Sequence, residues 1–175
     1  AGVATPALFE AIAAEAPKQM PAFIESSKKI TTFSPQALTN TAWAYATAGV
    51  EAPALFKTIA AEAQKKIATF DPQNLANTVW AYSTAGVAAP ALFEAIAVES
   101  SKKITTFSPQ ALTNTAWAYA TAGVEAPALF KTIAAEAQKK IATFDPQNLA
   151  NTAWAYATRK PRSRCRRSTR KTSQT

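Results

Sequence analysis

The sequence predicts an all-α fold, an α-solenoid of stacked 37-residue helical hairpins, from two superimposed periods. The tripeptide Trp-Ala-Tyr occurs four times at a constant spacing of 37 residues, and residues 25–78 recur unchanged at 99–152. A fixed period of roughly 20–50 residues is typical of solenoids, because one hairpin cannot bury its apolar face until copies stack on it. We therefore divide the chain into a partial or modified N-terminal repeat (1–32), a helical repeat array (33–158) and a basic tail expected to be disordered (159–175).

The first half of each repeat carries the signals of one helix, here called helix A. In the first complete repeat, Ser34 can cap this helix and Pro35 suits its first turn. Phe33 can contact Leu38 across that turn and so fix the angle at which the chain enters. Gly49 follows the last helical residue and can take the left-handed conformation that ends a helix.

The second half predicts another helix, here called helix B, which begins near Pro53 and carries apolar residues at helical spacing. Its polar side carries Glu62 with Lys65 and Lys66, three and four residues away, and we expect these charges to form ion pairs on the surface. The short connections require helices A and B to pack as antiparallel neighbours. The expected helices span residues 35–48, 53–68, 72–85, 90–105, 109–122, 127–142 and 146–158.

The apolar stripes predict which side chains are buried where repeats meet. We expect Leu38, Phe56, Ile59 and Ile67 to be buried, together with their equivalents 37 residues apart. Both ends of the array depart from the pattern. Residues 1–16 resemble the beginning of a helix B, and the fourth repeat is not followed by the sequence of one. We expect the chain to be a fragment of a longer protein.

The composition argues against an enzyme. Histidine is absent and Cys165 is the single cysteine, so neither Ser-His-Asp nor Cys-His catalysis is available. The commonest zinc sites also need these residue types, so we expect no metal and no other cofactor. No apolar run approaches the roughly 20 residues that span a bilayer, so we expect no membrane insertion.

The net charge of +8 is concentrated in the tail. Residues 1–158 contain 11 Lys and 11 Asp or Glu, so the array is electroneutral. A basic tail can neutralise phosphates and raise non-specific affinity for nucleic acid; alternatively, the abrupt change of composition indicates out-of-frame or read-through sequence. The charges of the tail are Arg159, Lys160, Arg162, Arg164, Arg166, Arg167, Arg170 and Lys171.

One face of helix A combines amide and hydroxyl groups with a large aromatic ring. Gln36, Asn40, Trp43 and Thr47 share this face, and such a stripe suits single-stranded RNA, which stacks on rings and bonds to amides. The alternative is structural: Trp43 fills the space between adjacent helices A, and Asn40 bonds to a neighbouring backbone group. The equivalent candidate residues are Asn77, Trp80, Thr84, Asn114, Trp117, Thr121, Asn151 and Trp154.

A second candidate is the position that alternates between repeats. Residues 37, 74, 111 and 148 are Ala, Asn, Ala and Asn, so Asn74 and Asn148 differ from their neighbours, whereas the Asn–Trp–Thr stripe does not vary. A code for bases needs residues that change from repeat to repeat. The alternation is therefore the best site for such a code; neutral drift at an exposed helix start is the alternative, and we favour it.

The repeat also resembles a known family. The run Phe-Asp-Pro-Gln-Asn-Leu-Ala-Asn-Thr-Val-Trp-Ala-Tyr at 70–82, followed by Gly86 and Pro-Ala-Leu-Phe at 90–93, resembles the octotricopeptide and heptatricopeptide repeats. These repeats occur in algal and protist proteins, often beside an RNA-binding RAP domain. The resemblance covers nearly all of residues 1–158. It implies an α-solenoid that binds RNA in a chloroplast or mitochondrion and aids its maturation, stability or translation.

Two functions follow as hypotheses. The first is a non-catalytic protein that binds single-stranded RNA along its concave face. The second is a protein-interaction scaffold, because an electroneutral array lacks the basic surface expected of a nucleic-acid binder. A positively charged groove would favour RNA, and an apolar groove with its charges on the outer face would favour a peptide.

Overall fold

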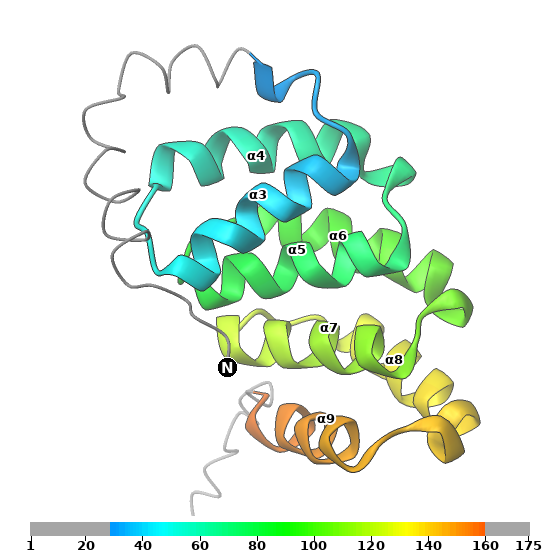
Figure 1. The fold of residues 1–175 in the computed structure, drawn as a ribbon. Coiled ribbons are helices and arrows are strands. Elements are labelled where there is room, and N and C mark those ends of the chain that lie inside the picture. The colour runs from blue at the N-terminus through cyan, green and yellow to red at the C-terminus, as the bar shows by residue number, and fades with distance from the viewer. Residues whose placement is uncertain (1–28, 160–175) are drawn as a thin grey trace, which may run out of the picture.

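In the computed structural model, which describes residues 29–159, every regular element is helical (Figure 1). The predicted α-solenoid is thereby confirmed, while residues 1–28 and 160–175, which include most of the expected N-terminal repeat and tail, lie outside the described residues. The helices A are α3 (Pro35–Ala48), α5 (Pro72–Thr84), α7 (Pro109–Ala122) and α9 (Pro146–Thr158). The helices B are α4 (Pro53–Lys66), α6 (Pro90–Lys103) and α8 (Pro127–Lys140).

The helices begin where the sequence predicts. The Ser34 side chain accepts a hydrogen bond from the backbone N–H of Ala37 at 3.2 Å, and the Asp71 carboxylate accepts one from Asn74 at 2.7 Å. Each cap satisfies a backbone donor that the first turn leaves free. At the other end of α3, Gly49 has φ 65°, a left-handed conformation that only glycine adopts without strain.

The helices B end two residues earlier than expected. Their last turn tightens into a 3₁₀ turn, in which Phe70 donates its backbone N–H to Ile67 at 3.1 Å. This turn brings the chain into the extended conformation of Phe70 that precedes the cap of the next helix A. The turns are η1 (Ile67–Thr69), η2 (Ile104–Thr106) and η3 (Ile141–Thr143).

The helices form two layers (Figure 1). The A layer consists of α3, α5, α7 and α9, and the B layer consists of α4, α6 and α8. Helices of the A layer pack on one another much more closely than helices of the B layer do. A stack that is tighter on one side curves toward that side, so the A layer forms the concave face of the solenoid.

The expected core is largely confirmed. Leu38, Phe56 and Ile59 are at most 1% exposed, and their equivalents are buried through the central repeats. The expectation is wrong for Ile67, which is only half-buried, for Ile141, which is 52% exposed, and for Leu149, the equivalent of Leu38, which is 40% exposed. The turns η1 and η2 each contact the helix B of the following repeat, α6 and α8, whereas no such helix follows η3 in the described chain.

The expectation that Glu62 lies on the surface is also wrong. Glu62 forms both predicted ion pairs, at 3.1 Å to Lys65 and 3.1 Å to Lys66, yet the residue is buried. Hydrogen bonds from these lysines hold the pKa of the Glu62 carboxyl below its usual value. Lys66 also donates to the backbone oxygens of Thr31 at 2.6 Å and Phe33 at 2.9 Å. The cluster therefore ties helix B to the turn before its own helix A.

A tyrosine–phenylalanine pair joins each helix B to the next helix A. The Tyr82 hydroxyl donates to the backbone oxygen of Phe56 at 2.6 Å, and the two rings meet edge to face with centroids 5.0 Å apart. Burial raises the pKa of Tyr82 well above its usual value. Tyr119 and Tyr156 make the same hydrogen bond to Phe93 and Phe130.

Candidate functional site

The four tryptophans of the A layer form one continuous stacked row, here called the tryptophan row. The ring centroids of Trp43 and Trp80 are 6.3 Å apart, those of Trp80 and Trp117 are 6.5 Å apart, and those of Trp117 and Trp154 are 6.3 Å apart. Neighbouring rings are inclined by 28° to 31°. The row follows from the 37-residue period, which puts the same residue at the same height on each successive helix A.

The stacking turns the faces of the inner rings toward one another. Trp80 and Trp117 are half-buried, whereas Trp43 and Trp154 at the two ends of the row are 46% and 45% exposed. The structural role that the sequence suggested for Trp43, filling the space between adjacent helices A, matches this geometry. Open ring faces on which a base can stack are therefore concentrated at the ends of the row, and the inner rings present their edges.

A hollow of about 840 Å³ lies beside this row, over α3, α5 and α7. Two rings of the row form part of its wall, together with amide side chains from two successive helices A. The volume is within the usual range of ligand sites, roughly 300–1,000 Å³. Its lining residues are Trp43, Asp71, Pro72, Gln73, Ala76, Asn77, Trp80, Thr106, Ser108, Gln110, Ala111 and Asn114.

Several polar groups of this hollow have no protein partner within the described chain, whereas the side chains of Asp71, Thr106 and Ser108 bond to the backbone of their own turns. No side-chain atom of Asn77 or Asn114 has a hydrogen-bond partner within residues 29–159, and none of these atoms is buried. The same holds for the indole N–H group of Trp80, which lines the hollow. The bond to neighbouring backbone that the sequence suggested for Asn40 is likewise absent from the described chain. The hollow thus combines donors and acceptors that protein groups do not satisfy.

The other residues of the Asn–Trp–Thr stripe lie outside the hollow. Asn40 and Asn151 are exposed on the outermost helices A of the described chain. The threonines sit at the C-terminal ends of their helices, where Thr158 donates to the backbone oxygen of Trp154 at 2.8 Å. Thr47, Thr84, Thr121 and Thr158 are all exposed, and none of them lines the hollow.

Two glutamines line the hollow at the position equivalent to Gln36, which the helical pattern places on this face although its equivalents were not among the candidate site residues. Gln73 and Gln110 are exposed and line the hollow four residues before Asn77 and Asn114. A spacing of four puts two side chains on one helix face, so the periodicity of helix A already contained this signal. The site therefore has four amide side chains in two equivalent pairs.

The alternating position lies at the start of helix A, against the preceding helix. Asn74 is half-buried, and its backbone oxygen is 3.5 Å from the hydroxyl of Thr39 on α3. That hydroxyl also bonds to Thr78 at 2.9 Å. In the repeats that carry alanine, Ala111 is 7% exposed. Asn74 and Asn148 therefore flank contacts between repeats, and neither lines the hollow.

The hollow is neither the positively charged groove expected for RNA nor the apolar groove expected for a peptide. Asp71 is the one charged residue among the lining residues of the described chain, and no lysine or arginine joins it. The lysines of the ion-pair clusters, such as Lys65 and Lys66, belong to the B layer. Arg162, Arg164, Arg166 and Arg167 lie outside the described residues.

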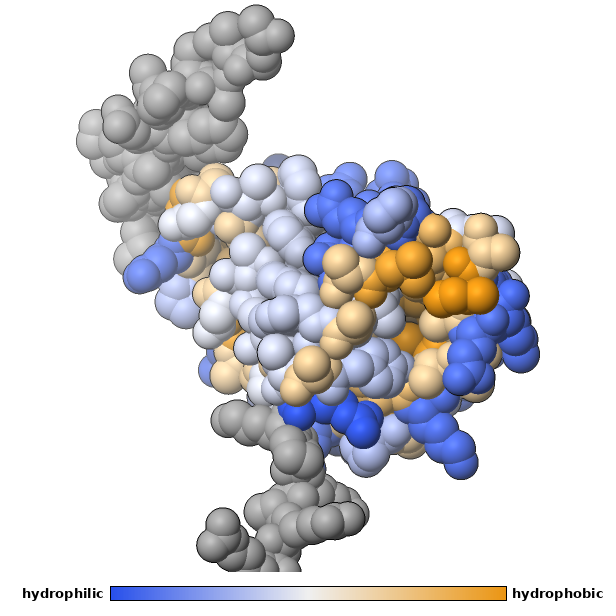
Figure 2. All heavy atoms as spheres, turned by 90° about the horizontal axis from the view of Figure 1, so that it is seen from below, coloured by the Kyte–Doolittle hydropathy of each residue, from blue (hydrophilic) through white to orange (hydrophobic). Residues whose placement is uncertain are grey.

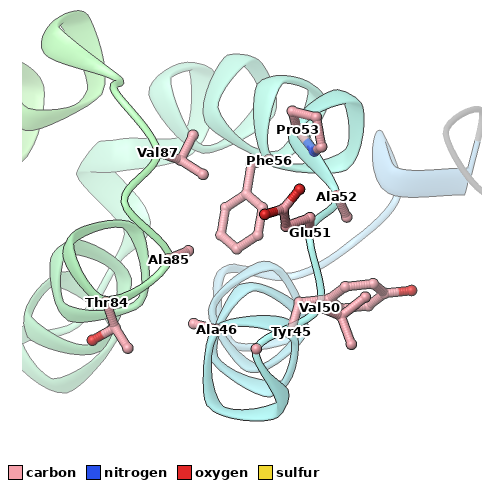
Figure 3. Close-up of a pocket in the computed structure, with 11 residues that line it drawn as sticks. Tyr45, Ala46, Val50, Glu51, Ala52, Pro53, Phe56, Thr84, Ala85 and Val87 are labelled. Carbon is pink, nitrogen blue, oxygen red and sulfur yellow. The ribbon is translucent and has the colours of Figure 1, made fainter. Parts of the chain in front are cut away.

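A second hollow, of about 360 Å³, lies where α3 turns into α4 (Figure 3). The Phe56 ring points into it and the Glu51 carboxylate lies beside the ring (Figure 3). Tyr45 and Thr84 add hydroxyl-bearing side chains to its walls, and the other lining residues are small or apolar. The residue equivalent to Glu51 in the next repeat is Ala88, so the carboxylate does not recur with each repeat.

Residues 29–159 contain no candidate for two other kinds of site, a metal centre and a transmembrane helix. Within residues 29–159, no three His, Cys, Asp or Glu residues gather closely enough to hold a metal ion. The helices in the same range are too short and too polar to cross a bilayer.

Comparison with known proteins gives one finding. Residues 10–121 match the family model of the Tbc2 translation factor, N-terminal domain. This match covers more than half of the chain and includes the helices that form the hollow beside the tryptophan row. The comparison with curated proteins found no match.

Proposed function

Because the chain belongs to the family of the Tbc2 translation factor N-terminal domain, we propose that it binds single-stranded RNA and acts in translation without catalysing a reaction. The repeats are then of the octotricopeptide or heptatricopeptide type, and the RNA is a transcript of a chloroplast or mitochondrion. The observation that carries the proposal is the hollow of the A layer, with two tryptophan rings and four amide side chains around it.

The chemistry of this hollow suits unpaired bases better than a duplex. Bases of a single strand expose their hydrogen-bonding edges, which amide groups can contact as donors and as acceptors. The free amides of Asn77 and Asn114 offer both kinds of group. The indole N–H group of Trp80 adds a donor, and the exposed ring of Trp43 can stack with a base.

Repeat identity limits how many sequences the hollow can distinguish. Gln73 and Asn77 recur as Gln110 and Asn114, so successive repeats present the same groups to the RNA. A code that reads one base per repeat needs residues that vary. We therefore expect a preference for unstructured RNA, with discrimination among bases that is weak and the same in each repeat.

The basic tail supplies the attraction to phosphates that the hollow lacks. The hollow is lined by one carboxylate and no cation, whereas the tail carries the whole net charge of the chain. Phosphate neutralisation releases counterions and makes binding depend steeply on salt, with a log–log slope of about −0.7 per phosphate for a single strand. Contacts to bases depend much less on salt.

The two contributions can be separated by titrating a labelled single-stranded RNA at several salt concentrations. The matched proteins are the intact chain and a variant in which Arg162, Arg164, Arg166 and Arg167 are replaced by serine. We expect the variant to bind more weakly, with a shallower slope, and to retain measurable affinity at low salt. Double-stranded RNA is the control ligand. It has no unpaired bases for the hollow to contact, so its binding should be mostly lost when the tail arginines are replaced.

A folded tail variant that fails to bind single-stranded RNA even at low salt would contradict the proposal. The scaffold function would then take its place, with the hollow of the A layer as a site for polar peptide groups. Circular dichroism melting of both proteins establishes that the variant is folded before binding is compared.

A further inference from the structure

The residue that caps each helix A differs from one repeat to the next. The cap is serine in α3 and α7 and aspartate in α5 and α9, so a carboxylate recurs in every second repeat. Two of these caps, Asp71 and Ser108, line the hollow of the A layer. The glutamine and asparagine amides beside them are the same in both repeats. The cap is therefore a position at which successive repeats present different chemistry to a ligand in the hollow.

The Asp71 carboxylate keeps one oxygen free for such a ligand. Its Oδ1 accepts the backbone N–H of Asn74 at 2.7 Å and so caps α5. Within residues 29–159 no protein group bonds to its Oδ2, and the residue is exposed. An ionised carboxylate only accepts hydrogen bonds, whereas the Ser108 hydroxyl can also donate one. Asp71 therefore adds to the hollow an oxygen that requires a donor from the ligand.

The charge of Asp71 also bears on which part of an RNA strand enters the hollow. No lysine or arginine of the lining offsets this carboxylate, so the hollow repels a phosphate. A base carries no net charge at neutral pH, and its edge can bond to the carboxylate and to the amides of the walls. A single strand therefore fits best with bases in the hollow and phosphates outside it.

We propose that Asp71 makes the hollow select bases that carry an exocyclic amino group, which are cytosine, adenine and guanine, over uracil. The inference rests on the proposed function, the binding of single-stranded RNA in this hollow. The amino group donates to the free oxygen of Asp71, as carboxylates of proteins accept from N4 of cytosine in DNA. Uracil has a carbonyl oxygen in place of that amino group, and two acceptors repel each other.

The other groups of the hollow suit the rest of such a base. Beside its amino group cytosine has two acceptors, N3 and O2, which need donors. The amide N–H groups of Asn77 and Asn114 and the indole N–H of Trp80 line the same hollow and have no protein partner in the described chain. The Trp43 ring, which is 46% exposed, offers a face for stacking. The carboxylate thus adds a preference to the weak discrimination that we expect of the repeated amides.

The chain itself offers a substitution that removes the charge and keeps the cap. Asp71→Ser introduces the residue found at the equivalent position, where Ser108 accepts the backbone N–H of Ala111 at 3.1 Å. Asp145→Ser is the matched control, because it makes the same change at a cap that does not line the hollow. It precedes α9, at the end of the array that Figure 2 views, where the surface is of mixed hydropathy. Both variants should fold, and circular dichroism melting checks this.

Each protein is titrated with oligocytidine and with oligouridine of equal length, at neutral pH and moderate salt, and the ratio of the two affinities is compared. The ratio cancels the general gain in RNA affinity that follows the loss of any carboxylate. Its comparison between proteins cancels differences between the two free RNAs. We expect Asp71→Ser to lower the preference for oligocytidine by roughly five- to tenfold, the lower part of the range for one good base contact. Asp145→Ser should keep the ratio of the wild type.

The outcomes separate this inference from the function on which it rests. An unchanged ratio in Asp71→Ser, or an equal change in both variants, would overturn the selection by Asp71 and leave the proposed function standing, because RNA would still bind. A folded wild-type chain that binds neither RNA would instead overturn the proposed function, and the inference with it.

Discussion

Helices α5 and α9 have nearly the same sequence, but several equivalent side chains are buried in α5 and partly or fully exposed in α9. Leu75 is fully buried and Leu149 is 40% exposed; Val79 and Tyr82 are fully buried, whereas Ala153 is exposed and Tyr156 is half-buried. Helix α5 packs against a helix A on each side and against the helix B of its own repeat, α6, whereas within residues 29–159 α9 has one helix A beside it and no helix B after it. In a repeat array, the residue type defines which face can be buried, and the adjacent repeat determines whether it is.

The same comparison explains where the candidate site lies. The hollow forms over α3, α5 and α7, where successive helices A flank one another, and it uses amides from the two inner helices. Asn151 of α9 has the same neighbours in sequence as Asn77 but lies outside the hollow. Function is therefore expected to reside in the middle of the array, although the ends carry the same residues.

The largest expected effect is the cost of truncating the same leucine in the two helices. Leu75→Ala should reduce the free energy of unfolding by about 2–5 kcal/mol, because it removes a fully buried side chain and leaves a cavity in the core. Leu149→Ala should cost less than about 1 kcal/mol, since that side chain is 40% exposed. Urea denaturation followed by circular dichroism measures both. If the two substitutions reduced the free energy of unfolding equally, Leu149 would have to be as buried as Leu75.

Removing the tyrosine hydroxyl should have a smaller effect. Tyr82→Phe should cost about 0.5–1.5 kcal/mol, because it removes the buried hydrogen bond to the Phe56 backbone oxygen. The corresponding change at Tyr156, which is only half-buried, should cost less. Thermal melting of the two variants and the wild type gives the comparison. If Tyr156→Phe reduced stability more than Tyr82→Phe does, the idea that neighbouring helices determine the strength of this hydrogen bond would be wrong.

The same tyrosines predict a loss of stability at alkaline pH. Burial raises the pKa of Tyr156 to about 12, from 10, and raises the pKa of Tyr82 further. A raised pKa in the folded state stabilises the fold below pH 10 and loses this contribution as the pH rises, since the unfolded chain ionises first. We expect the melting temperature to fall above pH 10, and Tyr82→Phe to lessen that fall more than Tyr156→Phe does. If the melting temperature fell equally in the wild type and both variants, the alkaline loss of stability would not come from these tyrosines.

The buried glutamates predict the opposite dependence at acidic pH. Hydrogen bonds from Lys102 and Lys103 lower the pKa of Glu99. A lowered pKa in the folded state stabilises the fold above the usual value of 4.5, and this contribution is lost as the pH falls below that value. Glu99→Gln should lower the melting temperature at neutral pH and have less effect at acidic pH. Glu94→Gln, at an exposed position of the same helix, is the control and should change little at either pH.

The sequence predicted the elements that depend on local signals. Ser34, Asp71 and Gly49 begin and end helices as expected, because caps and left-handed turns need only residues a few positions apart. The burial of Glu62 was missed for a different reason. The helical pattern assigns it to a polar side, but the cluster it forms with Lys66 reaches carbonyl groups more than thirty residues earlier in the chain.

The site was only partly predictable for the same reason. The stripe on one helix face follows from the sequence, and Asn77, Asn114, Trp43 and Trp80 of this stripe line the hollow. The stacking of the tryptophans on one another depends on the distance between successive helices A, which no single repeat contains. The exclusion of the threonines depends on the shape of the hollow.

The most direct test of the proposed function compares two pairs of asparagines at the same helix position. Asn77→Ala with Asn114→Ala removes both asparagine amides of the hollow, and Asn40→Ala with Asn151→Ala removes the equivalent amides outside it. The affinity of each double variant for single-stranded RNA is measured at moderate salt. We predict that the first pair weakens binding by roughly five- to hundredfold, for a loss of about 1–3 kcal/mol, and that the second pair changes it little. Unchanged affinity in the first pair, or an equal loss in both, would contradict an RNA site in the hollow of the A layer.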